Sequence, residues 1–177
     1  GALAGANEPS ALLDLPPLDD PAIDRAVMLT LRLQPSASMA QDRDLFALLA
    51  LTNYLSVLEH GLGIGAPGAI AVFGSLELLM TGAAAQAHAR TTIALEVARR
   101  QGGMLLSYTA FVHSWLVNHW YGPPADVLAL TREASGVGFE SGDLLFGSFN
   151  AAAHVVTLAL SGAPLDEVVA AADECHE

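Results

Sequence analysis

Polar and aromatic side chains concentrate in one short stretch of the sequence, residues 113–121, which holds both tryptophans of the chain. Two further polar residues, Asn150 and His154, fall in a later segment that is otherwise apolar. Side chains of these types on the concave side of a helical array would form a groove for a peptide or a small ligand. The candidate groove residues are Trp115, Asn118, His119, Trp120, Tyr121, Asn150 and His154. The alternative is that these residues pack between helices. Packing is favoured over a groove for the two tryptophans, and the two interpretations are about equal for Asn150 and His154.

Catalytic motifs are missing from the rest of the sequence. The chain has no lysine, which excludes a Walker A loop, a lysine that anchors phosphate in a kinase and a Schiff-base nucleophile. It contains no G-x-S-x-G motif, and its one cysteine, Cys175, lies directly beside His176 at the end of a predicted helix. Paired acids such as Asp166 and Glu167 stand at a helix start, where the helix dipole explains them. We therefore expect no catalytic residues in this segment.

Metal binding is also disfavoured by spacing. His113 and His119 are six residues apart, which places them about 120° apart around a helix. Neither has the i+4 partner of a helical metal site, and no pair of closely spaced cysteines occurs. We expect neither a metal nor a cofactor.

Charge and hydropathy restrict the partners. Nineteen acidic residues against seven arginines give a net charge of −12, which repels nucleic acid. The most apolar stretch, residues 62–85, is interrupted by glycines and by Glu77, so a buried helix is favoured over a membrane span. A single cysteine fits a reducing compartment, and we expect the cytoplasm, no membrane association and no nucleic-acid partner.

The apolar periodicity predicts an all-α chain after a partly irregular lead-in at residues 1–20. Each predicted helix is bounded by a cap residue, a proline or a glycine. The predicted helices are 21–33, 40–60, 67–81, 83–101, 104–120, 125–140, 143–160 and 164–176.

Two local details of the first helices are predicted from particular residues. Gln34 and Pro35 should end the first helix, and Ser38 with Gln41 should form a capping box for the second. Gly61 should end the second helix as the left-handed residue at its C′ position. In the second helix the buried stripe is expected to be Leu45, Leu48, Leu49, Thr52 and Leu55, widened by Tyr54, Val57 and Leu58.

Glycine-rich breaks recur about every 40 residues, at 61–65, 102–103 and 141–142, and two predicted helices follow each of them. Short connections make consecutive helices antiparallel. We predict a tetratricopeptide-like right-handed solenoid of about eight helices in four pairs, forming a single helical-repeat domain over residues 21–177.

Five strings occur in a characteristic order: LPPLDDP at 15–21, LEHG at 58–61, NHW at 118–120, GFESGDL at 138–144 and SGAPLDEV at 161–168. In this order they resemble the tetratricopeptide-like helical region of large bacterial multidomain signalling proteins. Those proteins carry a STAND (AAA-type) ATPase, often with serine/threonine-kinase-like, GAF, histidine-kinase, cyclase or DNA-binding modules. The chain departs from the family pattern at Leu62 and Tyr121.

The resemblance implies a non-catalytic regulatory scaffold that mediates protein–protein or interdomain contacts within a larger ATPase or kinase. The opening glycine without methionine is consistent with a segment of a longer chain. The alternative is a domain that senses a small molecule in the aromatic-polar groove. A homodimer and an unrecognised enzyme also stay open.

Overall fold

The computed structural model describes residues 8–175, and every regular element within that range is helical. The only extended pairing there is an isolated bridge between Pro17 and Leu62. The prediction of an all-α chain is therefore confirmed for the described residues. The elements are η1 (Pro9–Asp14), α2 (Pro21–Met39), α3 (Arg43–His60), α4 (Ala66–Thr81), α5 (Ala84–Arg100), α6 (Leu106–Phe111), η2 (Val112–Val117), η3 (Asn118–Trp120), η4 (Pro124–Val127), α7 (Leu128–Ser141), α8 (Leu144–Leu160) and α9 (Leu165–Glu174).

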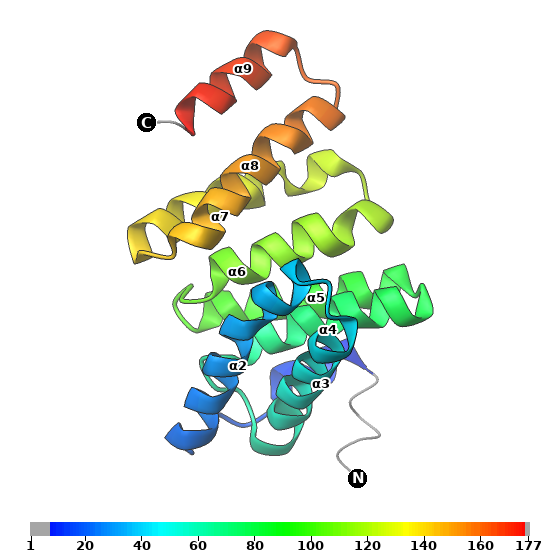
Figure 1. Cartoon of the computed structure of the whole chain (residues 1–177), viewed down its shortest axis with the longest axis vertical. Coiled ribbons are helices and arrows are strands. Elements are labelled where there is room, and N and C mark those ends of the chain that lie inside the picture. The colour runs from blue at the N-terminus through cyan, green and yellow to red at the C-terminus, as the bar shows by residue number, and fades with distance from the viewer. Residues whose placement is uncertain (1–7, 176–177) are drawn as a thin grey trace.

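The helices form a stack in which each long helix packs against the next one along the chain. Figure 1 shows α2 and α3 at one end of the long axis, α4 to α6 in the middle, and α7, α8 and α9 toward the other end. Within the lead-in, η1 packs against α5, and its Leu12 is fully buried.

Helix α4 is the centre of the core. Eleven of its residues are buried, including Ala69, Ile70 and Ala71 with no exposed surface. A helix that is apolar on all sides has to be enclosed by others, and here α2, α3, α5 and α6 surround it. The apolar stretch 62–85 is thus largely this buried helix, and no helix in the described part of the chain is long and apolar enough to cross a membrane.

The predicted end of the first helix is wrong. Helix α2 continues through Pro35 to Met39. Gln34 and Ala37 are both buried, so packing on the core holds the last turns in place although proline provides no backbone donor. Ser38 consequently lies inside α2, and the predicted capping box does not form.

The cap of α3 is instead an aspartate. The carboxylate of Asp42 accepts a hydrogen bond from the Leu45 amide at 3.0 Å. Gln41 makes the turn with a φ of 56°. The cap of α3 therefore lies four residues after the predicted Ser38, at a residue type that is also a favoured cap.

The predicted buried stripe of α3 is confirmed at Leu49, Tyr54 and Val57, but Leu45, Leu48, Thr52 and Leu55 are exposed. Ala50 and Asn53 face the core in their place. Tyr54 stacks on Phe73 of α4 with ring centroids 3.9 Å apart, which fixes the rotation of the helix. The exposed residues, here called the α3 leucine face, are Leu45, Leu48, Leu51 and Leu55.

Gly61 closes α3 with a φ of 100°, but its ψ of −168° is not that of the expected left-handed helical residue. The position is restricted to glycine by space as well. A Cβ there would lie 2.1 Å from the backbone oxygen of Pro16, which accepts a hydrogen bond from Leu62. Gly61 therefore allows the lead-in to dock beside α3.

Candidate functional site

The predicted continuous helix 104–120 is interrupted. Only Leu106–Phe111 is α-helical, and a six-residue π-helix, η2, and a short 3-10 turn, η3, follow. The wider i→i+5 turns of η2 place Val112, His113, Ser114 and Val117 inside, and π turns in a helix frequently mark functional sites. The aromatic-polar cluster lies on this irregular segment.

A hollow of about 250 Å³ lies beside η2 and η3, between them, η4 and the last turns of α8. We call it the aromatic pocket. Its residues are Ser114, Trp115, Asn118, His119, Pro124, Val127, Thr157 and Leu160.

Ser114 is the pocket residue whose side-chain oxygen is both buried and unpaired. Its side chain is buried, with 7% of the residue exposed, and its Oγ makes no hydrogen bond. Some buried hydroxyls on other helices bond back to carbonyls one turn earlier, as Ser75 does to Val72 at 2.7 Å and Thr131 to Val127 at 3.0 Å, whereas the Thr109 hydroxyl of α6 is unpaired like that of Ser114. A buried hydroxyl without such a bond is energetically unfavourable unless something outside the chain pairs with it.

The other side of η2 is fixed to α5. His113 Nδ1 lies 2.8 Å from the Thr91 hydroxyl, and the His113 and His88 rings are 5.0 Å apart. Burial, and to a smaller extent the neighbouring His88, lowers the pKa of His113 to about 4. His113 is therefore neutral at pH 7, and it positions η2 rather than exchanging protons.

The contact between Thr91 and His113 is one of three similar links between consecutive helices. Thr30 of α2 donates a hydrogen bond to Asn53 of α3, and Thr131 of α7 lies 3.1 Å from His154 of α8. In each link the threonine hydroxyl also lies within hydrogen-bond distance of carbonyls in its own helix. These links give several polar side chains a structural role, because each joins two neighbouring helices.

The seven predicted groove residues do not form one site. Trp115, Asn118 and His119 line the aromatic pocket. Trp120 and Tyr121 are exposed beside it, and Tyr121 stacks on His88 with centroids 4.2 Å apart.

Asn150 is separate from the pocket and fully buried. Its amide nitrogen donates to the carbonyl oxygens of Ser107 and Phe146, at 2.8 Å each. It therefore ties α8 to α6, and its role is structural.

His154 lines a different, shallow hollow, most of which belongs to α7. Its Nδ1 donates to the Leu128 carbonyl at 3.1 Å. Burial lowers the pKa of His154, as does the charge of Arg132, and the bond to Leu128 opposes them. His154 therefore shares no cavity with Trp115 or His119.

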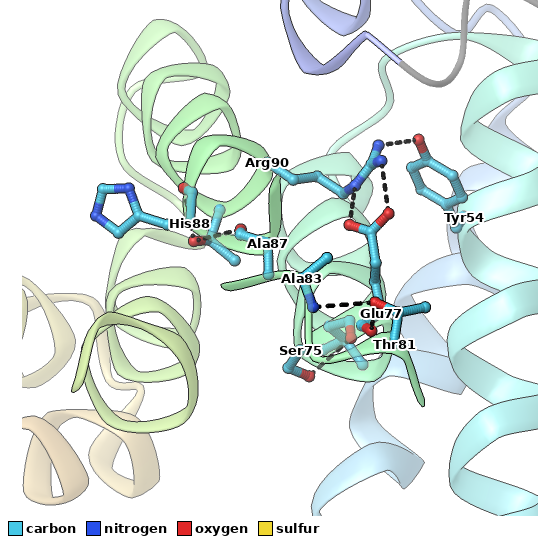
Figure 2. A network of polar contacts seen from close by, with 10 residues as sticks. Tyr54, Ser75, Glu77, Thr81, Ala83, Ala87, His88 and Arg90 are labelled. Atoms are coloured by element: carbon cyan, nitrogen blue, oxygen red, sulfur yellow. Dashed lines mark hydrogen bonds and ion pairs between the residues drawn. The ribbon is translucent and has the colours of Figure 1, made fainter. Parts of the chain in front are cut away.

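The most buried charged group lies elsewhere, between α4 and α5. Figure 2 shows Arg90 extending from α5 toward the carboxylate of Glu77 and the hydroxyl of Tyr54, while His88 points to the opposite side. Arg90 Nε and Nη2 bond the two Glu77 oxygens at 3.0 and 3.2 Å, and Nη1 bonds the Tyr54 oxygen at 2.5 Å. The guanidinium also lies 5.1 Å from the centre of the Phe73 ring.

A ligand cannot reach the Arg90 guanidinium, because Arg90 is only 2% exposed. Burial raises the pKa of Tyr54, against the opposing effect of Arg90. The sequence held one signal for it, a single glutamate within an apolar helix. We interpret the cluster as a structural clamp between α3, α4 and α5.

Within residues 8–175, no three histidine, cysteine or acidic side chains come together as a metal site would require. Comparison of the chain with protein-family models, curated proteins and solved structures found no match.

Proposed function

We propose that this chain is a non-catalytic, tetratricopeptide-like scaffold that binds a partner protein or a neighbouring domain within a cytoplasmic signalling ATPase or kinase. The α3 leucine face carries this proposal. Leu48 is 62% exposed and Leu55 49%, on a helix that lies at one end of the stack. The order of the five sequence strings supports the signalling context.

The geometry of the α3 leucine face suits a helical partner. Its four leucines cover about 120° of the helix surface, at about 100° per residue. An apolar stripe with this spacing is the surface on which an amphipathic helix packs. Isolated exposed leucines need no explanation, but four on one face indicate an interaction surface. We therefore propose an amphipathic helix as the occupant.

A photocrosslinking experiment in cells tests the scaffold proposal. A photoreactive residue at Leu51 should give a discrete crosslinked product, whereas the same residue at Ser148, exposed on α8, should give none. The Leu48→Glu and Leu55→Glu double variant should abolish the Leu51 product without changing the midpoint of thermal unfolding. No product at Leu51, equal products at both positions, or a product that joins only two copies of this chain would refute the proposal.

A second candidate function, ligand sensing, is supported by the aromatic pocket. The unpaired Ser114 hydroxyl lies on η2, whose neighbouring residue His113 is bonded to α5. A ligand bound in the pocket beside Trp115 would therefore act on an element that packs against α4, α5 and α6. Hydrogen exchange across a metabolite panel tests this: a hit should slow exchange at Val112–Val117, and Leu160→Trp should remove the effect. Unchanged exchange with a ligand shown to bind would refute sensing.

A further inference from the structure

Acidic residues stand at both ends of the α3 leucine face. Asp44 lies in the first turn of α3 and Glu59 in the last. At about 100° per residue, both fall inside the arc of about 120° that the four leucines span. Asp44 is exposed, as is 76% of the Glu59 side chain. The surface is therefore an apolar stripe with a carboxylate at each end.

The fold alone does not account for these two carboxylates. Asp44 stands where the helix dipole favours an acid, but Glu59 lies in the last turn, where the dipole disfavours one. Among residues 8–175, Asp44 has no ion-pair partner. Glu59 pairs there only with the adjacent His60, whose Nε2 lies 3.7 Å from Glu59 Oε2. Both carboxylates are therefore available to a partner.

The arginines of α2 and α3 lie on other sides of their helices. Arg43 falls about 80° outside the arc of the leucines. On α2, the Thr30 hydroxyl bonds to Asn53 of α3, which marks the side of α2 that faces α3. Arg25 and Arg32 fall about 140° and 160° around α2 from Thr30, on its far side. No arginine of these two helices is therefore placed to neutralise the face.

This charge pattern is unsuited to a second copy of the chain. If two α3 helices pair antiparallel about a two-fold axis, Asp44 meets Glu59 of the other copy, and if they pair parallel, each acid meets its own equivalent. Like charges meet in both orientations, and the net charge of −12 adds to the repulsion. An anionic membrane surface is disfavoured for the same reason. A helix that is basic at both ends has the complementary charge.

We propose that the α3 leucine face binds a basic amphipathic helix of another protein or domain, with an apolar stripe and a lysine or arginine near each end. Asp44 and Glu59 are 15 residues apart, about 22 Å along α3, so the matching helix has about four turns. This inference rests on the scaffold function proposed above and specifies the charge of its partner.

Two synthetic helical peptides test the charge of the partner on the full chain by fluorescence anisotropy. Both are about 16 residues long and carry the same dye and the same leucine stripe, and they differ only in a lysine or a glutamate near each end. The lysine peptide should bind about tenfold more tightly, because each exposed ion pair contributes a factor of up to about five. This preference should shrink as salt is added. Equal binding, tighter binding of the glutamate peptide, or no saturable binding of either would overturn the proposal.

Variants place the binding event. Asp44→Asn with Glu59→Gln should reduce the preference for the lysine peptide to less than about twofold. The matched control is Asp166→Asn with Glu167→Gln, which removes two charges in the first turn of α9, at the other end of the stack, and should leave the preference unchanged. Asp44→Lys with Glu59→Lys should transfer the preference to the glutamate peptide. If the two neutralising pairs had equal effects, net charge alone would attract the peptide, and the site would be overturned.

Photocrosslinking at Leu51 separates this inference from the function on which it rests. A discrete product that persists unchanged in the variant with Asp44→Asn and Glu59→Gln would uphold the scaffold and refute the basic partner. The expected peptide preference without any product at Leu51 would uphold the charge of the surface and refute the scaffold. Circular dichroism of each variant establishes that the fold is retained.

Discussion

Two regions of this molecule treat their buried polar groups in opposite ways. Between α4 and α5, Arg90 is sealed from solvent, with Glu77, Tyr54 and an aromatic ring around it. Beside η2, Ser114 is buried but unpaired, and the neighbouring Trp115 is 41% exposed. A buried charge that is fully paired holds elements of the fold together, whereas an open hollow leaves space for a ligand. We therefore interpret the clamp as structural and propose the pocket as a candidate binding site.

Breaking the clamp should produce the largest effect. Glu77→Ala leaves the Arg90 guanidinium buried without its counter-charge, and we expect the free energy of unfolding to fall by about 3–4 kcal/mol. Urea denaturation followed by circular dichroism measures this. Replacing both residues, with Glu77→Leu and Arg90→Met, should recover most of the loss, because no unpaired charge remains.

The control for the clamp is an exposed ion pair. Arg99 and Glu133 lie 3.1 Å apart with about half of each side chain exposed, so Glu133→Ala should cost less than about 1 kcal/mol. If Glu77→Ala costs no more than Glu133→Ala, the clamp does not hold α3, α4 and α5 together.

The neutral state of His113 should appear as a pH dependence of stability. Its pKa falls from 6.5 when unfolded to about 4 when folded, so between these values the unfolded chain binds a proton that the folded chain does not. The free energy of unfolding should therefore decrease as the pH falls through this window, by up to about 3 kcal/mol. Above pH 6.5 this contribution is constant.

Urea denaturation from pH 7 to pH 4 measures that slope. His113→Gln should flatten it, whatever the stability of the variant at pH 7, and the remaining slope should include a contribution of the same sign from His154. An identical slope in the wild type and in His113→Gln would show that this histidine is not held neutral by burial.

Close packing at the α7–α8 crossing should rank third. A Cβ on Gly138 would lie 2.6 Å from the Gly147 Cα, backbone that cannot easily move. Gly138→Ala should lower the free energy of unfolding by about 2 kcal/mol or more. Gly136, two residues away on α7, has open space around it, so Gly136→Ala should instead stabilise by about 0.5–1 kcal/mol. Thermal unfolding of both variants distinguishes them, and equal shifts would mean that α7 and α8 are not in close contact.

The elements of this fold were predictable where a local residue decides them. Asp20 accepts from the amides of α2, Gly82 ends α4 in the left-handed conformation, and Asp143 caps α8. Helix type and spacing follow from such signals together with apolar periodicity.

The rotation of α3 was not predictable in the same way. Leucines occur on both sides of that helix, so periodicity alone does not distinguish the core face from the α3 leucine face. The stacking of Tyr54 on Phe73 decides it, and that contact joins two helices. The prediction of where α2 ends was wrong for a similar reason. Burial of Ala37 against the core outweighs the local tendency of Pro35 to end a helix.

The candidate site was predicted in part. The concentration of tryptophan, histidine and asparagine marked the segment in which Trp115, Asn118 and His119 line one pocket. The π-helix and the unpaired Ser114 were not expected, because contacts such as that of His113 with Thr91 hold that segment and they exist only in the folded chain. Asn150 and His154 carry polar atoms for which the sequence cannot tell a structural partner from a ligand.

The variant with the smallest expected change in the free energy of unfolding tests the difference between the two regions most directly. Ser114→Ala removes a hydroxyl that has no partner, so the free energy of unfolding should stay constant or rise by up to about 1 kcal/mol. Thr91→Val also removes one buried hydroxyl, but it leaves His113 Nδ1 without its partner and should cost about 1–3 kcal/mol. Urea denaturation at pH 7 compares the two variants. A loss of more than about 1 kcal/mol in Ser114→Ala would mean that the hydroxyl serves the fold, and the distinction between a sealed clamp and an open pocket would disappear.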